Sequence, residues 1–360
     1  MNEFYAVVLA GGSGTRFWPA SRKLRPKQLL SITPGSDQTL IEQTVRRIES
    51  LATPERTLIA TGRHLIDGTK RALPWLPPES FLGEPLAKNT APCIAWATAL
   101  IHAKDPEALV MVLPSDQHVS DNEAYLCAIQ LALESAKQGN VTTVGLTPTR
   151  PETGYGYIQA GSVGSEGVRR VERFVEKPDK PTAQKYLASD DYYWNAGMFF
   201  FRASVMKAAL ERFCPSLWTA MAAIANSPGD ASSLVQSAFS EAESVSIDYA
   251  VMEKLDDMRV VPADFGWSDV GSWEVAWELG DKDAQGNVCP EGTVLVDAAR
   301  NLTRDLRTSK DQKRVIALVG VDDLCVIETD DAILIIPRER SQDVRAAVDV
   351  LKARGSNELL

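Results

Sequence analysis

Residues 7–30 read VVLAGGSGTRFWPASRKLRPKQLL, an apolar run that passes directly into a glycine-rich turn. The turn contains Gly11, Gly12, Ser13 and Gly14 and is followed by Thr15 and Arg16. Three glycines in four positions allow backbone N–H groups to point inward and cradle phosphate oxygens. A tight turn at the end of a strand would account for these four residues equally well, so their meaning depends on the residues after them.

Two cationic side chains come after the turn, Arg16 at its end and Lys27 eleven residues later. Either charge alone is more typical of a solvated surface, but together with the turn they can bracket a triphosphate. Two familiar phosphate-binding motifs are excluded by the residues themselves. The turn lacks the pattern G-x-x-x-x-G-K-[ST], and Phe17 stands where the dinucleotide-binding fingerprint requires its third glycine.

The first two thirds of the chain alternate short apolar runs with helix-like stretches, as expected of an α/β domain around a mainly parallel sheet. Nearly all-apolar runs at residues 6–9, 57–60, 109–113 and 142–146 are typical of strands covered on both faces. Between the first two runs, Thr39 and Glu42 form the capping box of a predicted helix. Residues 150–180 contain hairpin-like pieces, and WNAGMFFFR at residues 194–202 predicts a further buried strand.

The C-terminal part of the chain has a different pattern. DKDAQGN at residues 281–287 indicates a turn or linker, and short β-rich runs separated by Asp- and Gly-containing turns come after it. We therefore predict a large α/β domain over residues 1–285 and a small β-rich domain, a sheet or a short β-solenoid, over residues 286–360. Ser341 is the predicted N-cap of a closing helix, and Gly355 is its predicted end.

Composition argues against several classes of protein. The 360 residues carry a net charge of −10, which is unlike a general nucleic-acid binder with a basic face. Five scattered cysteines without a CxxC pair, and three histidines without a close pair, argue against a disulfide framework and a zinc or histidine-rich centre. The run YAVVLA starts too close to Met1 for a signal peptide, and no apolar run reaches the ~20 residues that span a membrane. We expect a soluble, cytoplasmic protein.

The stretch at residues 7–30 resembles the signature of the sugar-nucleotide pyrophosphorylases, and its FWP and PKQ elements are most similar to those of the mannose-1-phosphate guanylyltransferases (GDP-mannose pyrophosphorylases). Further motifs occur in the family's order: GEPLAKNTAPCIAWA, VLPSDQHV, FVEKPD with WNAGMFFF, and SIDYAVMEK with FGWSDVGSW. This resemblance implies a Rossmann-like nucleotidyltransferase catalytic domain with a mainly parallel sheet. It also implies a small C-terminal β-rich domain that ends in a helix, with a short left-handed β-helix as one possible form. The isomerase-like domain of longer members is not found here, which implies a monofunctional enzyme.

Two aspartates can hold one hard divalent cation together with phosphate oxygens and water. Asp116 comes after an apolar strand, at the edge where open α/β sheets bind ligands, and Asp269 lies in a turn of FGWSDVGSW. Each alone is more typical of an ordinary turn or helix cap. The resemblance implies that the two aspartates hold Mg²⁺, and that the catalytic residues are Arg16, Lys27, Asp116 and Asp269. The family usually has His directly after the first aspartate, whereas Gln117 precedes His118 here, which leaves the role of His118 open.

The resemblance also assigns the substrate pockets. The glycine turn and the GEPLAKNTAP motif would bind the nucleotide, with a carboxylate suited to the N–H donors of guanine; the residues of the second motif are Glu84, Asn89 and Thr90. The sugar phosphate would contact Gly156, Glu176, Lys177, Asn195 and Gly197. Purely structural roles stay open for these residues. Asn89 or Thr90 can cap a helix, EKP can be an exposed turn, and the aromatic residues beside the glycines can belong to the core.

The resemblance therefore implies transfer of GMP from GTP to α-D-mannose 1-phosphate, by Mg²⁺-dependent in-line attack on the α-phosphate, giving GDP-mannose and pyrophosphate. A pyrophosphorylase for another nucleotide and hexose 1-phosphate is the nearest alternative. A regulatory protein with a dead nucleotidyltransferase fold would be expected to lack the cations or the aspartates. A glycosyltransferase usually carries a D-x-D motif, but the triplet at residues 281–283 lies in the predicted linker. The apolar strands and last helix of the C-terminal domain need a partner surface, either the catalytic domain or the second subunit of a homodimer.

Overall fold

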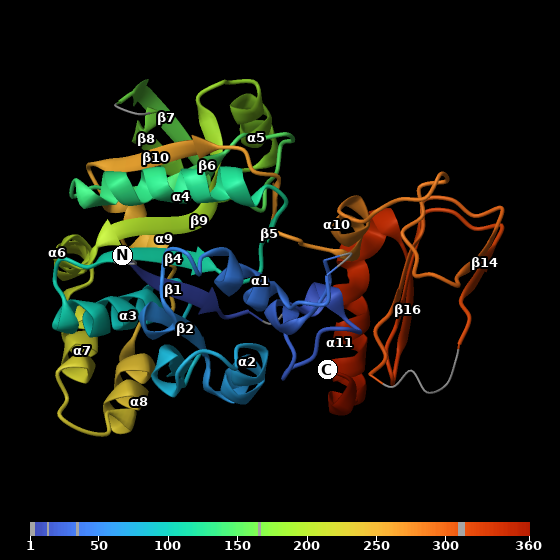
Figure 1. The fold of residues 1–360 in the computed structure, drawn as a ribbon, viewed down its shortest axis with the longest axis horizontal. Helices are drawn as coiled ribbons and strands as arrows, with labels where there is room; N and C mark the ends of the chain where they lie inside the picture. The colour runs from blue at the N-terminus through green and yellow to red at the C-terminus, as the bar shows by residue number, and fades with distance from the viewer. Residues whose placement is uncertain (1–3, 13, 34–35, 165–166, 309–313) are drawn as a thin grey trace. The chain divides into compact units, whose positions relative to one another are not determined.

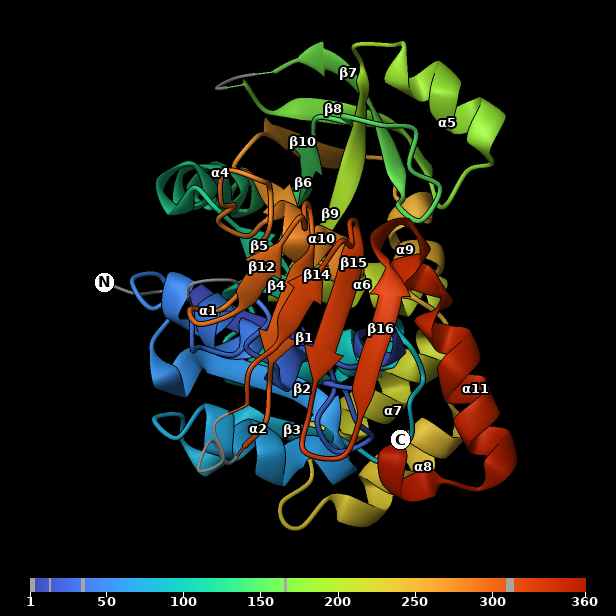
Figure 2. The ribbon, with the colours of Figure 1, turned by 90° about the vertical axis from the view of Figure 1, so that its right-hand side faces the viewer.

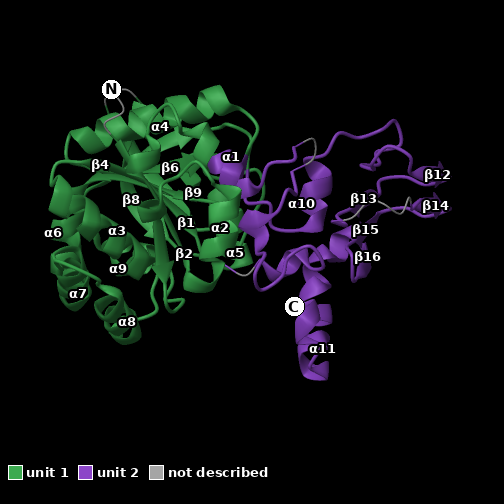
Figure 3. Cartoon of the chain, turned by 60° about the horizontal axis from the view of Figure 1, so that its bottom comes forward, with its two compact units in different colours: residues 1–11, 45–115, 119–267 green, residues 12–44, 116–118, 268–360 purple. Residues whose placement is uncertain are grey.

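The computed structural model describes residues 4–12, 14–33, 36–164, 167–308 and 314–360, which form two compact units (Figure 3). Unit 1 comprises residues 1–11, 45–115 and 119–267, and unit 2 comprises residues 12–44, 116–118 and 268–360. Neither unit is continuous in sequence, because residues 12–44 and 116–118 pack with the C-terminal region. Helix α1 (Leu40–Arg47) and the two-residue strands β5 (His118–Val119) and β11 (Trp267–Ser268) lie where the chain passes from one unit to the other.

Unit 1 is built on a nine-stranded sheet with the order β3-β2-β1-β4-β9-β6-β10-β8-β7 (Figure 1). In chain order its strands are β1 (Phe4–Ala10), β2 (Thr57–Gly62), β3 (Phe81–Glu84), β4 (Leu109–Pro114), β6 (Val141–Leu146), β7 (Tyr157–Val163), β8 (Arg169–Val175), β9 (Tyr192–Arg202) and β10 (Met258–Ala263). Strands β3, β2, β1 and β4 are parallel, as are β6 and β10, while β9 runs antiparallel between β4 and β6. The predicted α/β fold with a mainly parallel core sheet is confirmed.

Both faces of this sheet are covered by helices, which explains the nearly all-apolar strands. Successive side chains of a strand point to opposite faces. Val110 and Val112 of β4 therefore pack in the cluster that contains α3, while Met111 and Leu113 pack in the cluster that contains α4. The helices of unit 1 are α2 (Ile66–Ala72), α3 (Thr90–Lys104), α4 (Asn122–Lys137), α5 (Lys180–Leu187), α6 (Ala203–Phe213), α7 (Pro215–Ala225), α8 (Ser232–Glu241) and α9 (Ile247–Ala250).

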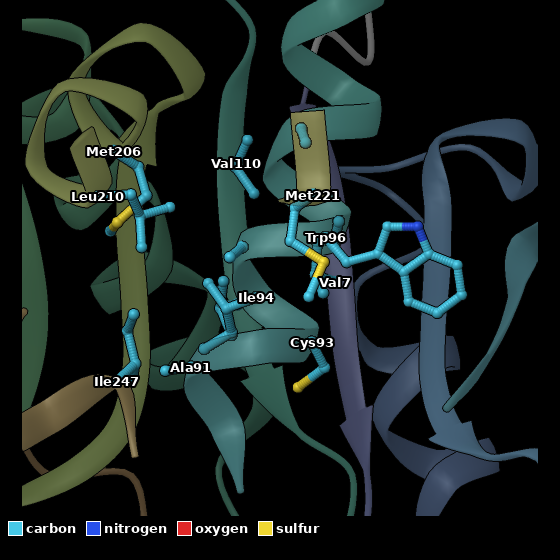
Figure 4. Packing of buried hydrophobic residues seen from close by; sticks show 14 of the residues in the cluster. Val7, Ala91, Cys93, Ile94, Trp96, Val110, Met206, Leu210, Met221 and Ile247 are labelled. Carbon is cyan, nitrogen blue, oxygen red and sulfur yellow. The ribbon is translucent and has the colours of Figure 1, made fainter. Parts of the chain in front are cut away.

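Helix α3 is apolar on nearly all sides because it is packed between the sheet and a second layer of helices, α6 and α7. Figure 4 shows Ile94 and Trp96 of α3 with Val110 of β4 and Met221 of α7. A helix that is apolar all round is expected to be buried in this way. This packing fixes the N-terminal end of α3, where a predicted nucleotide motif lies.

The local predictions for the rest of unit 1 and for α1 agree with the structure. The backbone N–H of Glu42 donates to the hydroxyl of Thr39 at 3.3 Å, so Thr39 caps α1. Strands β7 and β8 form the predicted antiparallel hairpin, and the predicted strand at residues 194–202 is the C-terminal part of β9.

Unit 2 combines residues 12–44, from Gly12 to the first part of α1, with short strands and the helices α10 (Trp273–Glu278) and α11 (Val344–Arg354). Strands β12 (Val294–Val296) and β14 (Ala317–Val319) pair in parallel. Strand β15 (Leu324–Glu328) pairs in parallel with β13 (Leu302–Asp305) and antiparallel with β16 (Ile333–Pro337), beside which it lies in Figure 2. The predicted β-rich region with a terminal helix is confirmed.

The core of unit 2 joins residues that are very distant in the sequence. Leu302 and Ile327 of the C-terminal strands are fully buried in one cluster with Phe17 and Trp273. Unit 2 is therefore stabilised by contacts between the segment after the glycine turn and the C-terminal strands. The strands supply apolar support beneath that segment.

The predicted N-cap of the last helix is wrong, whereas its predicted end is confirmed. Ser341 lies inside a 3₁₀ turn (Arg338–Asp343) that continues directly into α11, so the helix begins after Asp343. An N-cap residue normally has an extended backbone, and the preceding helical turn leaves none at this position. Gly355 ends α11 in the left-handed conformation, with a φ of 74°.

Candidate active site

Gly14, at the end of the glycine turn, packs directly against Lys27. Gly11 ends the first segment of unit 1, and Gly12 and Gly14 in unit 2 have positive φ angles of 124° and 55°. A Cβ atom at residue 14 would lie 2.5 Å from Cβ of Lys27 and 2.7 Å from its backbone nitrogen. Only glycine fits at residue 14, since a side chain would collide with this backbone and strain the left-handed conformation. Ser13, which the sequence analysis also places in the nucleotide site, lies outside the described residues.

Arg16 is positioned by the turn that comes after the glycines. Residues Thr15–Phe17 form a 3₁₀ turn, and the ring of Phe17 packs edge-on against Trp273 with 5.0 Å between the ring centroids. The guanidinium group of Arg16 donates to the carbonyl oxygen of Gly271 at 3.3 Å. These contacts hold the guanidinium group of Arg16 beside Gly271 of the FGWSDVGSW motif.

A second cation, Lys27, contacts both predicted metal-binding aspartates. Its side chain is only 10% exposed, and its Nζ atom donates to Oδ2 of Asp116 at 2.8 Å. The same Nζ atom donates to the backbone carbonyl oxygen of Asp269. Gly271 borders this group, because a Cβ atom there would lie 2.9 Å from Oδ2 of Asp269 and 3.3 Å from Nη1 of Arg16. Unit 2 thus brings the four predicted catalytic residues together.

The donor atoms of the two aspartates suit a divalent metal ion. A carboxylate oxygen of Asp116 and the carbonyl oxygen of Asp269 contact the same ammonium group, so both residues can present oxygen to one cation. Hard divalent cations prefer such oxygen donors. Within the described ranges, no group of three or more His, Cys, Asp or Glu side chains is placed to hold a metal.

The five predicted sugar-phosphate residues lie together in unit 1, beside strands β7, β8 and β9. A Cβ atom at Gly156 would lie 2.5 Å from Oε2 of Glu176, and the backbone N–H of Asn195 donates to the carbonyl oxygen of Gly156 at 2.8 Å. Glu176, whose side chain is 11% exposed, forms an ion pair with the exposed Lys177. The backbone N–H of Gly197 donates to Oδ1 of Asn195 at 3.1 Å.

One residue of this cluster is absent from the predicted set. Asp248, in the short helix α9, accepts a hydrogen bond from Nδ2 of Asn195 at 3.1 Å. Burial, assisted by the negative charge of Glu176, raises the pKa of Asp248 to about 6. A carboxylate with a perturbed pKa beside a predicted site residue is typical of functional sites. Its motif, SIDYAVMEK, is visible in the sequence, but nothing local indicates that this aspartate reaches β9.

The predicted purine-binding residues lie at the end of β3 and the start of α3, also in unit 1. Glu84 is 8% exposed, and desolvation raises the pKa of its carboxyl group to about 7. The side chain of Asn89 caps α3 by accepting from the backbone N–H of Thr90 at 2.9 Å, so the helix-capping role is confirmed. The hydroxyl of Thr90 accepts from the backbone N–H of Ile247 at 2.9 Å. Glu84, by contrast, has no ion-pair partner among the residues that the structure describes.

Other chemistry-bearing residues are the cysteines, the triplet at residues 281–283 and His118. The five cysteines are free thiols. The Asp-Lys-Asp triplet at residues 281–283 comes just before a turn, where Oδ1 of Asp283 accepts from the backbone N–H groups of Gln285 and Asn287. His118 opens the short strand β5 and is partly buried. Over the ranges that the structure covers, no helix combines the length and apolar character needed to cross a membrane.

Comparison with known proteins finds similarity over nearly the whole chain. Residues 5–286 match the nucleotidyl transferase family, and residues 293–351 match the MannoseP isomerase/GMP-like β-helix domain. The mannose-1-phosphate guanylyltransferase of Escherichia coli is 40% identical over 98% of this chain and 74% of its own length. The xanthan biosynthesis protein XanB of Xanthomonas campestris pv. campestris is 40% identical over 99% of this chain and 75% of its own. A crystal structure described as the mannose-1-phosphate geranyltransferase of Thermus thermophilus is 34% identical, covers 97% of this chain and 99% of its own, and superposes with a TM-score of 0.86.

Proposed function

Since this chain belongs to the nucleotidyl transferase family, among relatives named mannose-1-phosphate guanylyltransferase, we propose that it transfers GMP from GTP to α-D-mannose 1-phosphate. The products are GDP-mannose and pyrophosphate. The observation that carries this proposal is the 40% identity with the Escherichia coli guanylyltransferase over almost the full chain. The ordered sequence motifs point to the same reaction.

The reaction requires charge stabilisation rather than acid–base catalysis by the protein. An oxygen of mannose 1-phosphate is already anionic at neutral pH and attacks the α-phosphorus of GTP in line. The new bond joins this oxygen to the α-phosphorus, while the bond from the α-phosphorus to the bridging oxygen of pyrophosphate breaks. The protein must therefore reduce the repulsion between two anions and stabilise the charge on the leaving pyrophosphate.

Arg16 and Lys27 are the cations that we assign to the triphosphate. The guanidinium group of Arg16 offers several N–H donors that suit phosphate oxygens, and its hydrogen bond to Gly271 holds it in place. Lys27 is nearly buried, so its charge is screened less by water than that of a surface lysine. The backbone N–H groups of the glycine turn would add hydrogen bonds to phosphate oxygens.

Members of this family generally use a divalent metal ion, and we propose that Asp116 and Asp269 hold Mg²⁺. When bound there, Mg²⁺ supplies Lewis-acid neutralisation of charge on the phosphate oxygens. Independently of the metal, the 2.8 Å ion pair between Asp116 and Lys27 orients the ammonium group. Asp116 thus has two proposed tasks, to bind the metal and to position Lys27.

We assign mannose 1-phosphate to the cluster around Asn195. The carboxylate of Glu176 and the amide of Asn195 are suited to sugar hydroxyls, and the exposed ammonium group of Lys177 is suited to the phosphate. Gly156 is consistent with this assignment, because a Cβ atom there would lie 2.5 Å from Oε2 of Glu176 and would displace that carboxylate.

We assign the guanine base to Glu84. An ionised carboxylate can accept hydrogen bonds from both N1–H and the exocyclic amine of guanine. Burial of this carboxylate without an ion-pair partner is unfavourable in the free protein, as its raised pKa indicates. Two hydrogen bonds from guanine would offset that cost, which favours a ligand with two adjacent donors.

Pyrophosphate release, measured for four nucleoside triphosphates against a panel of hexose 1-phosphates, tests the proposed function. We expect GTP with mannose 1-phosphate to be the best pair. A clear preference for UTP or dTTP with glucose 1-phosphate would contradict the guanine and mannose assignments but keep the reaction class. No release with any pair would favour a regulatory protein that has lost activity.

Three further assignments belong to this proposal: a cytoplasmic location, assembly as a homodimer, and a boundary near residue 285 between the catalytic domain (1–285) and the C-terminal β-rich domain (286–360). Light scattering on the purified protein tests the dimer. Expression of residues 1–285 alone tests whether that segment folds independently.

A further inference from the structure

The side-chain amide of Asn195 is held at three points in unit 1. Its Oδ1 atom accepts from the backbone N–H of Gly197 at 3.1 Å and lies 3.2 Å from the hydroxyl of Thr143. Its Nδ2 atom donates to Oδ1 of Asp248 at 3.1 Å. The hydroxyl of Thr143 also lies 2.8 Å from the carbonyl oxygen of Met198. This carbonyl oxygen and Oδ1 of Asn195 therefore compete for the single hydroxyl proton of Thr143.

These partners do not contribute equally to the orientation of the amide. The hydroxyl of Thr143 can donate or accept, so it tolerates either end of the amide. The N–H of Gly197 can only donate, and an ionised carboxylate at Asp248 can only accept. Rotating the Asn195 amide by 180° would therefore place its NH₂ against an N–H and its oxygen against a carboxylate. Gly197 and Asp248 together allow one orientation.

This orientation leaves one donor available. The NH₂ group of Asn195 has two N–H bonds, and Asp248 accepts from one of them. Among the described residues, no acceptor is found for the other. Asn195 also lies next to Gly156, whose missing side chain leaves room for Glu176. Because Asn195 is only partly buried, the second N–H can donate to an acceptor that enters from outside the chain, such as a sugar hydroxyl.

Asp248 itself is fixed by the start of α9. Ser246 caps this short helix by accepting from the backbone N–H of Tyr249 at 3.4 Å. Two backbone groups beside the cap contact α3: the N–H of Ile247 donates to the hydroxyl of Thr90, and the N–H of Ala91 donates to the carbonyl oxygen of Val245 at 3.1 Å. The carboxylate is therefore carried by a segment that is tied to the buried helix α3.

We propose that Asp248 is a positioning residue for the sugar-phosphate substrate, which sets the Asn195 amide so that its free N–H donates to a hydroxyl of the hexose ring. This inference rests on the proposed function and deepens it, since it concerns how the same site recognises its sugar. Asp248 acts through Asn195, and it need not touch the substrate.

The charges around Asp248 make this role dependent on pH. Glu176 and Glu253 carry negative charge toward Asp248, and Lys177 opposes them with positive charge. Burial is the main reason that the pKa of Asp248 rises to about 6. Above this pKa the carboxylate only accepts and holds the amide in one orientation. Below this pKa the protonated group can also donate, so only the N–H of Gly197 still opposes the flipped amide, the orientation is held less firmly, and binding of the sugar phosphate weakens.

The test is a double-mutant cycle on Asp248 and Asn195, with KM values for both substrates. Asp248→Asn should raise the KM for mannose 1-phosphate about 3- to 10-fold, the scale of one lost neutral hydrogen bond, and leave the KM for GTP unchanged. In an Asn195→Ala background, the same substitution should add nothing, because there is no amide left to orient. Glu253→Gln is the matched control, since it removes an exposed neighbouring charge that makes no hydrogen bond to Asn195; its KM should stay within about twofold of wild type.

The outcomes separate the inference from its alternatives. The inference would be overturned if Asp248→Asn raised the KM for mannose 1-phosphate equally in the presence and absence of the Asn195 side chain. It would also be overturned if Glu253→Gln raised this KM as much as Asp248→Asn does. If Asp248→Asn does not fold, the KM of wild type and Asn195→Ala is compared between pH 5 and 8. Titration of the substrate phosphate affects both proteins equally. A steeper rise of the KM at low pH in wild type than in Asn195→Ala therefore supports the inference, and parallel pH profiles of the two KM values contradict it. If wild type prefers another hexose 1-phosphate, the proposed function fails, and the same cycle is run with that substrate.

Discussion

Replacement of Glu84 by glutamine should make the protein more stable at alkaline pH and less selective for GTP. Glu84 is 8% exposed, and burial raises the pKa of its carboxyl group from 4.5 to about 7. Because the folded pKa lies above the unfolded one, the folded protein binds this proton more tightly. The stabilisation is complete below pH 4.5 and is lost as the pH rises through about 7.

The size of this effect comes from the shift in pKa. One pKa unit corresponds to about 1.4 kcal/mol, so a shift from 4.5 to about 7 makes the ionised carboxylate cost the folded state about 3 kcal/mol at pH 8. Glutamine does not titrate. The difference in the free energy of unfolding between Glu84→Gln and wild type should therefore increase by about 2–3 kcal/mol in favour of the variant between pH 5 and pH 8.

The same carboxylate should control recognition of guanine. A protonated Glu84 or a glutamine offers one acceptor and one donor, which no longer match two N–H groups of the base. We expect Glu84→Gln to raise the KM for GTP about 10-fold or more and to narrow the preference for GTP over ATP. In wild type, the KM for GTP should rise as the pH falls below about 7, and this dependence should disappear in the variant.

Denaturant unfolding at pH 5 and pH 8, together with steady-state kinetics for GTP and ATP, provides the assay. Glu79→Gln serves as the control, because Glu79 is an exposed carboxylate just before the same strand. Glu79→Gln should alter neither the pH dependence of the free energy of unfolding nor the selectivity for GTP over ATP. An unchanged stability difference across this pH range would show that Glu84 is not desolvated as the structure indicates. A stability change without any change in GTP selectivity would remove Glu84 from the guanine site.

The remaining predictions test the other assignments. Asp116→Asn and Asp269→Asn should each raise the Mg²⁺ concentration required for activity and reduce turnover steeply, and the double variant should be scarcely worse than either single variant. A Mg²⁺ titration of the activity of all four proteins checks this expectation. If the losses in turnover multiply in the double variant, the two aspartates do not share a metal. Lys177→Ala should raise the KM for the sugar phosphate and spare GTP binding, whereas Arg16→Ala should lower kcat about 10²–10³-fold. If steady-state kinetics showed instead that Lys177→Ala abolishes GTP binding and leaves the KM for the sugar phosphate unchanged, the assignment of Lys177 to the sugar phosphate would be wrong. Ile327→Ala should destabilise the protein by about 2–5 kcal/mol in denaturant unfolding, because its side chain is fully buried. It should also lower turnover, because this core supports the segment after the glycine turn, and full activity in the destabilised variant would refute that link.

The features that the sequence alone determines are those that depend on residues close together in the chain. Strands with uninterrupted apolar runs can be stable only when both sheet faces are covered, so the α/β fold is predictable from runs such as residues 109–113. The capping role of Thr39 depends only on a hydroxyl three residues before a backbone N–H, and the end of α11 depends on a glycine that adopts the left-handed conformation. Ser341 shows the limit of such rules, because the 3₁₀ turn around it is invisible in the local pattern.

Ligand-binding residues could be named from motifs, but their contacts could not. The motifs name Lys27 and Asp116 separately, and only the folded chain places the ammonium group of one 2.8 Å from the carboxylate of the other. Similarly, SIDYAVMEK contains Asp248, but its bond to Asn195 joins residues 53 positions apart. A hydrogen bond of this kind forms only when the folded sheet and helices bring two distant chain segments together. The spacing of residues within one motif does not predict it.

The largest feature decided by tertiary structure alone is unit 2. By sequence, the glycine turn belongs with the first strand, and the C-terminal strands form a separate unit. In the folded chain, Phe17 and Trp273 share a core with Leu302 and Ile327, so the segment after the glycine turn and the C-terminal strands stabilise one another. Each of these segments is too short to bury its own apolar side chains, and burial of apolar surface has no preference for neighbours in sequence. Which distant segments combine is therefore settled by shape and packing in three dimensions.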